Sequence, residues 1–217
     1  MKDVSLILSA LILLTAFVLI AGKRIQSYIS ALRLQGILIA LNTGLIGIAA
    51  FREDGGIDIL IVCLLLILLK VFYIPRQLHK AYAKVEHQVS KDFFLNIPML
   101  VLISIAIVIL TYFTVSAVAP ADSQTTILLV NAISLVLIGL FFIISRKKAI
   151  GQIVGLLVIE NGLFITAMYA SDGMPFIVDM GIFVDLMTAV LILGVMVARI
   201  NTAFESIDTQ NMSNLRG

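Results

Sequence analysis

The chain has 217 residues, of which 61% are hydrophobic and 13% are charged, and its mean hydropathy is +1.13. Soluble domains are about 45–50% apolar and about 25% charged, so this composition excludes a soluble globular protein. The net charge of +2 and the absence of a basic tract argue against nucleic acid as a partner. The lipid bilayer is the predicted environment.

Seven apolar stretches are long enough to cross a membrane, since a spanning helix needs about 20 mostly apolar residues. They cover approximately residues 4–22, 27–51, 57–75, 94–118, 125–145, 149–170 and 177–199. The first stretch follows one Lys and one Asp instead of a basic cluster, so we interpret it as a helix and not as a signal peptide. The predicted fold is an all-α polytopic membrane protein with seven transmembrane helices.

The connecting segments alternate in charge. Basic residues follow the first, third and fifth stretches, and the other connections are acidic or polar. The basic positions are Lys23, Arg24, Arg76, Lys80, Lys84, Lys91, Arg146, Lys147 and Lys148. Because basic loops stay in the cytoplasm, the N-terminus is predicted outside and the C-terminus inside, as an odd number of spans requires.

The long polar segment 76–93 is predicted to be a cytoplasmic amphipathic loop, with a short helix that places Leu78, Tyr82, Val85 and Val89 at helical spacing. It divides the chain into parts. Residues 1–75 form an N-terminal three-helix part, and 94–124 hold the fourth helix and an outer loop. Residues 125–200 form a second three-helix module, and 201–217 form a cytoplasmic tail.

Glu160 is the most informative polar residue of the apolar stretches. It follows Ala149 by eleven residues, which places it roughly 16 Å into its helix, close to the membrane centre. A charge at that depth costs about 2.5–3.5 kcal/mol on insertion scales, so the group must be protonated, paired or hydrated from inside. Two interpretations stay open: a step in a proton path, or a packing contact between helices.

Four further residues are candidates for the same path. Asp185 lies about 12 Å into the seventh stretch, and Asp179 lies near its outer end. Lys70 lies about one turn inside the third stretch, and Arg33 about two turns into the second. Both have long side chains that can also reach the membrane surface. Asn42 and Asn131 are expected to form hydrogen bonds between helices.

The chain offers few side chains that bind metals or cofactors. Cys63 is the single cysteine, and His79 and His87 both lie in the 76–93 segment. We therefore expect no cofactor, metal site or catalytic residue on this chain.

Residues 125–200 resemble the three-helix K subunit of NADH-quinone oxidoreductase and the C subunit of multisubunit cation/proton antiporters. This resemblance rests on SRKKAIGQIVGLLVIENGLFI, a basic turn and a helix with Gly155 and a central Glu160. The whole chain resembles hydrogenase-4 component E, with LLKVFYIPRQLHK and MGIFVDLMTAVLILGVMVARI included in the resemblance.

The resemblance implies a membrane subunit of a group 4 hydrogenase or formate hydrogenlyase-like complex in a bacterial or archaeal cytoplasmic membrane. Its partners would be antiporter-like membrane subunits and hydrogenase-type membrane and peripheral subunits. Fe–S clusters and a metal active site would lie on those partners. Glu160 takes the place of the first membrane acid of the K subunit, and Asp185 that of the second. Lys70 and Arg33 have no counterpart there.

Three functions stay open at this point. The chain could conduct protons or Na⁺ within a redox complex or a multisubunit antiporter. It could be a structural adaptor that joins antiporter-like subunits to the redox module without conducting ions. It could also be a free-standing transporter or sensor, although no inverted repeat or broken helix pair is evident.

Overall fold

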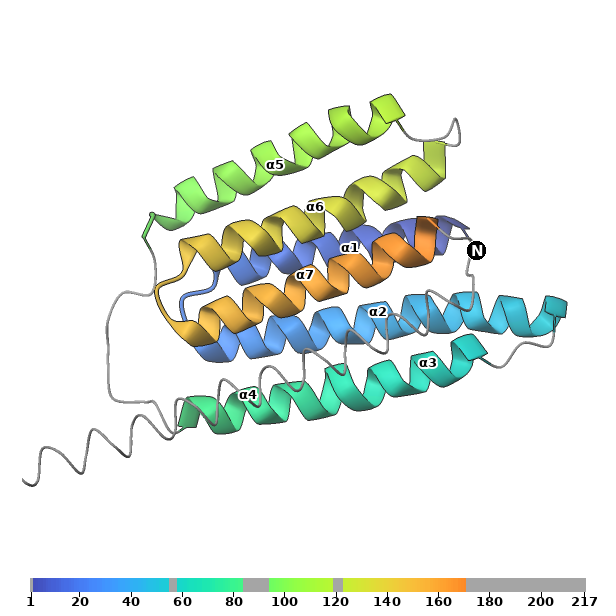
Figure 1. Ribbon diagram of the computed structural model, residues 1–217, viewed down its shortest axis with the longest axis horizontal. Helices are drawn as coiled ribbons and strands as arrows, with labels where there is room; N and C mark the ends of the chain where they lie inside the picture. Colours follow the sequence, from blue (N-terminus) through green and yellow to red (C-terminus); the bar gives the residue numbers. More distant parts are fainter. Residues whose placement is uncertain (1, 55–57, 84–93, 119–122, 171–217) are drawn as a thin grey trace, which may run out of the picture.

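The computed structural model describes residues 2–54, 58–83, 94–118 and 123–170, and all its regular secondary structure is helical (Figure 1). The elements are α1 (Lys2–Ala21), α2 (Ile25–Asp54), α3 (Asp58–Leu66), the π-helix η1 (Ile67–Tyr73), α4 (Ile74–Ala83), α5 (Ile97–Val118), α6 (Ser123–Ser145) and α7 (Ala149–Ala170). The seventh predicted stretch, with Asp179 and Asp185, lies outside the described residues.

Six of these helical segments are long and apolar enough to span a membrane. They run over Asp3–Ala21, Ile25–Arg52, Ile59–Lys80, Ile97–Val118, Gln124–Ser145 and Ile150–Ala170. Each corresponds to one of the first six apolar stretches. The prediction of a multi-pass helical membrane protein is therefore confirmed over the described part of the chain.

The third span is longer than the sequence predicted. α3, η1 and α4 follow one another without leaving helical geometry, so the helix continues beyond residue 75 to Ala83. Pro75 and Arg76 end the apolar run, but α4 is amphipathic and buries Leu78 against the rest of the protein. The expected position of Lys70, one turn from a helix end, was wrong. Lys70 lies near the middle of the continuous helix.

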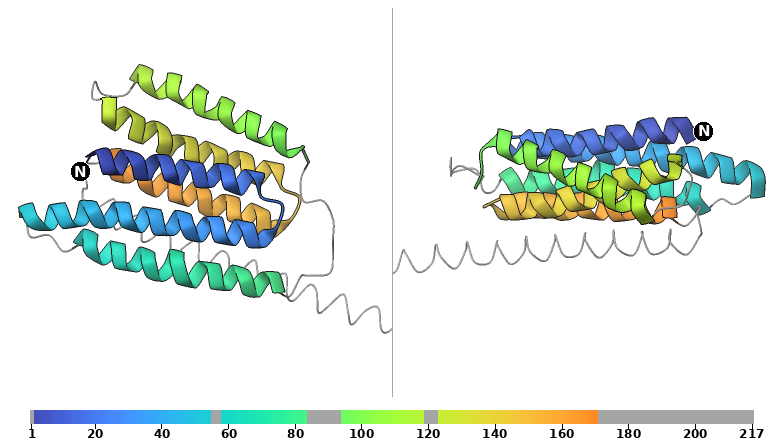
Figure 2. Two further views of the ribbon diagram at one scale, coloured as in Figure 1. Left: turned by 180° about the vertical axis from the view of Figure 1, so that it is seen from behind. Right: turned by 90° about the horizontal axis from the view of Figure 1, so that it is seen from above.

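The spans run alongside one another in two layers, with α1 in one layer and α6 and α7 in the other (Figures 1 and 2). α7 packs against α6 and α2, and α1 packs against α2, α5 and α6. α5 lies at one flank and the α3–η1–α4 helix at the other, where it packs on α2. The core includes Ile12, Ile39, Leu135 and Ile165, all at most 1% exposed. Among the candidate spans, α7 has the largest buried share, and it buries Glu160 and Asn161.

The turns are held together at one end of the bundle. The Arg146 guanidinium, in the α6–α7 turn, donates to the Tyr28 hydroxyl (2.9 Å) and to the Ile20 carbonyl (3.0 Å). The Phe94 N–H donates to the Ser145 carbonyl at the same end. At the other end, Gln124 donates to Asp3. The basic turns that follow the first and fifth apolar stretches therefore lie together.

Candidate functional site

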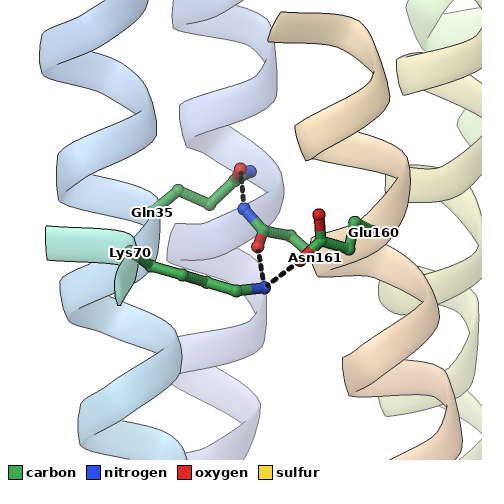
Figure 3. Close-up of polar contacts among 4 residues, drawn as sticks. All are labelled: Gln35, Lys70, Glu160 and Asn161. Atoms are coloured by element: carbon green, nitrogen blue, oxygen red, sulfur yellow. Dashed lines mark hydrogen bonds and ion pairs between the residues drawn. The ribbon is translucent and has the colours of Figure 1, made fainter. Parts of the chain in front are cut away.

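The central polar feature is an ion pair between η1 and α7. Lys70 Nζ lies 3.2 Å from Glu160 Oε1, and the two side chains are 5% and 3% exposed (Figure 3). Lys70 thus points into the bundle, so the alternative in which it reaches the membrane surface does not describe this structure. Of the three ways to accommodate Glu160, the structure shows pairing.

Two amide side chains extend this pair. Lys70 Nζ donates to Asn161 Oδ1 at 2.6 Å, and Asn161 Nδ2 donates to Gln35 Oε1 at 2.8 Å (Figure 3). Gln35 Nε2 in turn contacts the Ile12 carbonyl at 3.5 Å. Gln35 is fully buried and Asn161 is 4% exposed. The four side chains Gln35, Asn161, Lys70 and Glu160 form one network, which we call the central polar network.

Two local features bring Lys70 to α7. The seven-residue π-helix Ile67–Tyr73 has Lys70 at its centre. Such segments change which residues of a helix face its neighbour, and they are frequent at functional sites. Opposite Lys70, α2 has Gly36, where an added Cβ would lie 3.1 Å from Lys70 Cβ and 3.3 Å from its carbonyl oxygen. The absence of a side chain at Gly36 allows η1 to approach α2 closely enough for Lys70 to reach α7.

The pair is not fully hydrogen-bonded. Neither carboxylate oxygen of Glu160 has a hydrogen-bond donor in the described part of the chain, and Oε1 has only the 3.2 Å ion contact. The Lys70 ammonium also lies 5.6 Å from the Phe164 ring centroid. A buried ion pair that lacks further hydrogen bonds offsets its desolvation poorly.

Apolar layers lie on both sides of the central polar network along the α2–α7 interface. On the side that the loop charges predict to be cytoplasmic, Leu32 lies three residues before Gln35, and Val158 lies three residues before Asn161. Both are buried. In the other direction Ile39 and Ile165 are buried, each four residues after them. Beyond that layer Asn42 donates to the Tyr169 hydroxyl at 2.7 Å. Along the α2–α7 interface, the described layers next to the network in both directions are thus apolar.

The other predicted residues lie elsewhere. Arg33 is exposed on the outer side of α2, with its guanidinium 5.9 Å from the Phe72 ring centroid, so it does not join the network. Asp179 and Asp185 fall outside the described residues. Asn42 and Asn131 form the predicted contacts between helices, Asn131 with Ser9 at 2.9 Å. Among the described residues, no three His, Cys, Asp or Glu side chains gather closely enough to hold a metal ion.

Comparison with known proteins places the chain next to two kinds of relative. The uncharacterised protein Rv0085 of Mycobacterium tuberculosis is 28% identical over 207 residues, which cover 94% of this chain and 92% of that protein. Hydrogenase-4 component E of Escherichia coli K12 is 26% identical over 149 residues, which cover 68% of this chain and 69% of that protein. This chain is distantly homologous to hydrogenase-4 component E. No family model and no solved structure matches it.

Sequence reasoning identified Lys70 and Glu160 one by one but not as partners. Nothing in the sequence connects a lysine of the third apolar stretch to a glutamate of the sixth. Gln35 and Asn161 were visible as polar residues in apolar stretches. Their contact depends on which spans are neighbours in the bundle, and the order of the spans along the chain does not determine that arrangement.

Proposed function

We propose that this chain is a non-catalytic membrane subunit of a hydrogenase-type redox complex, and that the Lys70–Glu160 pair changes its charge as protons or Na⁺ move through the membrane arm. The observation that carries the proposal is the buried ion pair between two spans, near the middle of α7, in which the Glu160 carboxylate accepts no hydrogen bond from the described residues. The homology to hydrogenase-4 component E supports the assignment to such a complex.

The net charge of the pair depends on whether Glu160 is protonated, and that charge can influence titratable groups far from the pair. With Glu160 ionised, the pair is neutral overall, and when Glu160 takes up a proton the pair carries one positive charge. In a medium of low dielectric constant this difference acts over long distances on neighbouring acids and bases. Charged groups that interact in this way titrate together, so a redox event in a partner can drive proton transfer here. Asp185, Asp179 and Arg33 stay predicted members of the path.

The proposal includes the arrangement expected from the sequence. The chain would span a bacterial or archaeal cytoplasmic membrane seven times, with the N-terminus outside and the C-terminus inside. Antiporter-like and hydrogenase-type subunits would contact it, and Fe–S clusters and a metal active site would lie on those partners. Residues 125–200 would correspond to the K subunit of NADH-quinone oxidoreductase.

A double variant tests conduction separately from assembly. Replacing a buried ion pair by apolar residues of similar size is often neutral or stabilising, whereas removing one partner is strongly destabilising. Lys70→Met combined with Glu160→Leu should therefore leave the complex assembled in native membranes. We expect proton uptake into inverted vesicles, driven by the electron donor of the complex, to fall about tenfold or more, since positioned proton-transfer groups typically contribute 10²–10⁴-fold.

The matched control is Asn131→Leu, which removes a partly buried polar contact between spans, that with Ser9, and should leave uptake unchanged. An assembled double variant with normal proton uptake would contradict the proposal and favour the structural adaptor. If the double variant does not assemble, Glu160→Gln keeps the shape of the side chain and gives the same comparison. The same vesicles identify the ion: donor-driven uptake of Na⁺ without uptake of H⁺ would show that the complex moves Na⁺.

A further inference from the structure

We infer that Asn161, oriented by Gln35, is a positioning residue that keeps the Lys70 ammonium in place when Glu160 loses its charge. The inference concerns the central polar network and rests in part on the proposed function, because it explains how the pair could change charge without coming apart. The contacts in Figure 3 carry the argument.

The ammonium has two acceptors on α7, from adjacent residues. Asn161 Oδ1 accepts from Lys70 Nζ at 2.6 Å, whereas Glu160 Oε1 lies 3.2 Å away. A hydrogen bond from a charged donor is commonly about 2.7–2.9 Å long, so the amide holds the ammonium more closely than the carboxylate does. Lys70 is thus positioned by a group that has no charge to lose.

The orientation of the Asn161 amide is set by a second helix. Its Nδ2 donates to Gln35 Oε1 at 2.8 Å, which leaves Oδ1 directed at Lys70. Gln35 has no exposed surface, and its own Nε2 is directed at the Ile12 carbonyl of α1. If Asn161 were to rotate by half a turn, it would present NH₂ to the ammonium and a carbonyl to another carbonyl. The contact with Gln35 prevents that arrangement.

The consequence appears when Glu160 is protonated. One O–H bond forms on the carboxylate, the incoming proton arrives from an internal water or a neighbouring acid, and Lys70 keeps its three N–H bonds. The network, neutral before, then carries a positive charge. An amide oxygen remains an acceptor at every physiological pH, so Asn161 still binds the ammonium. Without Asn161, the acceptor that α7 offers the ammonium would be the uncharged carbonyl oxygen of the protonated Glu160 carboxyl, a weaker partner than the carboxylate.

A thermal-stability cycle in the solubilised intact complex tests this inference. The variants are Glu160→Leu, Asn161→Leu and the two combined. Each single variant leaves the ammonium one of its two acceptors on α7, and the double variant removes both. We expect the combined loss in unfolding temperature to exceed the sum of the single losses by roughly 4–8 °C, as coupled contacts predict. Adding Lys70→Met to the double variant should restore the part of the loss that comes from the unpaired ammonium, but not the part that comes from Gln35.

Two comparisons make the outcome specific. Asn42→Leu removes another buried asparagine of this interface, whose partner is Tyr169, and combined with Glu160→Leu it should give an additive loss. Asn161→Gln keeps an amide and should restore part of the stability that Asn161→Leu loses. Strict additivity of Glu160→Leu and Asn161→Leu would overturn the inference.

Where the double variant does not fold, the Lys70→Met background replaces it. There Asn161→Leu loses only the hydrogen bond to Gln35, so it should cost clearly less than in the native background. A loss as large as in the native background would overturn the inference. The cycle measures no transport, so the two proposals can fail separately. An additive cycle together with lost proton uptake in the Lys70→Met/Glu160→Leu variant removes the role of Asn161 and leaves the proposed function intact. A coupled cycle together with normal proton uptake in that variant supports the role of Asn161 and contradicts the proposed function.

Discussion

Arg146 shows how much a single charged residue can differ from its appearance in the sequence. It belongs to the basic turn Arg146-Lys147-Lys148, which suggests a hydrated loop, yet it is 1% exposed. Its guanidinium donates to the Ile20 carbonyl near the end of α1 and lies 4.1 Å from the Phe142 ring centroid. The last carbonyls of a helix have no partners within that helix, and a basic group there satisfies them.

Arg146→Leu should therefore destabilise the protein by about 2–4 kcal/mol, because it takes this donor away from the end of α1 and from the Tyr28 hydroxyl. Arg146→Lys should recover only part of this, because a single ammonium cannot reproduce the planar fork of donors. Thermal unfolding in detergent measures both. Lys147→Leu, at the exposed neighbouring position, is the control: it loses the contact of the ammonium with the Phe94 ring, at 4.8 Å, and should cost at most about 1 kcal/mol. Equal effects at 146 and 147 would contradict the capping role.

Residue by residue, the sequence was most informative where a charge stood in an apolar stretch. Lys70 and Glu160 were both recognisable by that criterion, because such residues rarely occur without a function or a partner. Arg146 was missed because a basic residue next to two others follows the ordinary pattern of a cytoplasmic loop. Burial of a turn depends on the helices around it, and those contacts are not encoded locally.

At the scale of elements, the closest packing lies between α6 and α7. A Cβ at Gly162 would lie 2.7 Å from Val136 Cγ2 and 2.8 Å from the Val136 nitrogen, and a Cβ at Gly155 would lie 2.5 Å from Ile143 Cγ1. Small residues at such contacts allow helix backbones to approach within a membrane, where association depends on packing. This contact fixes the position of α7 and therefore of Glu160.

Gly162→Ala should separate α6 from α7, because the new methyl group meets backbone atoms that cannot move independently. We expect a loss of about 1–3 kcal/mol in stability, read as a lower unfolding temperature of the purified protein. Gly44→Ala is the matched control, since its Cβ would meet only Cys63 Sγ, at 3.2 Å. That variant should be neutral or slightly stabilised by the helix preference of Ala. Equal tolerance at both positions would show that the interface is looser than these distances indicate.

Element types were predictable because long apolar stretches in lipid must satisfy their backbone groups as helices. The boundaries of the third span were not. Its apolar run ends near Pro75, and a proline normally marks a helix end, but the burial of Leu78 keeps the chain helical. The π-helix at Ile67–Tyr73 has no sequence signature that we recognise. It changes the helical register by tertiary contact, with Gly36 as the neighbour that permits it.

At the scale of the whole molecule, the charges of the loops predict how the bundle is oriented in the membrane. The turns near Lys23 and Lys147 lie at one end of the bundle, and Arg52 is the last residue of the span that leads to the other end. With Cys63 replaced by Ser, Lys23→Cys and Lys147→Cys should react with a membrane-impermeant maleimide only after permeabilisation. Arg52→Cys should react in intact cells. The reverse pattern would overturn the positive-inside assignment.

The accessibility of a C-terminal tag in intact cells determines the number of spans. Six spans would place the first residues of α1 and the last residues of α7 on the same side of the membrane. A C-terminal tag that is accessible only after permeabilisation, together with an external N-terminus, would require a further crossing in 177–199. A tag that is accessible in intact cells would leave six crossings and exclude the predicted seventh.

The central position of the Lys70–Glu160 pair has an electrical consequence. Glu160 lies 11 residues after the start of α7 and 10 before its end, so a proton that reaches it from either side crosses about half of the membrane field. A full crossing corresponds to about 2.3 kcal/mol for each 100 mV, so this half crossing corresponds to roughly 1.2 kcal/mol. At about 150 mV the ratio of protonated to ionised sites would then change by about twentyfold relative to an unpolarised membrane, since each 1.4 kcal/mol is a factor of ten. Under the proposed function the network would therefore act as a voltage-dependent proton store, whose filling follows the cell's membrane potential.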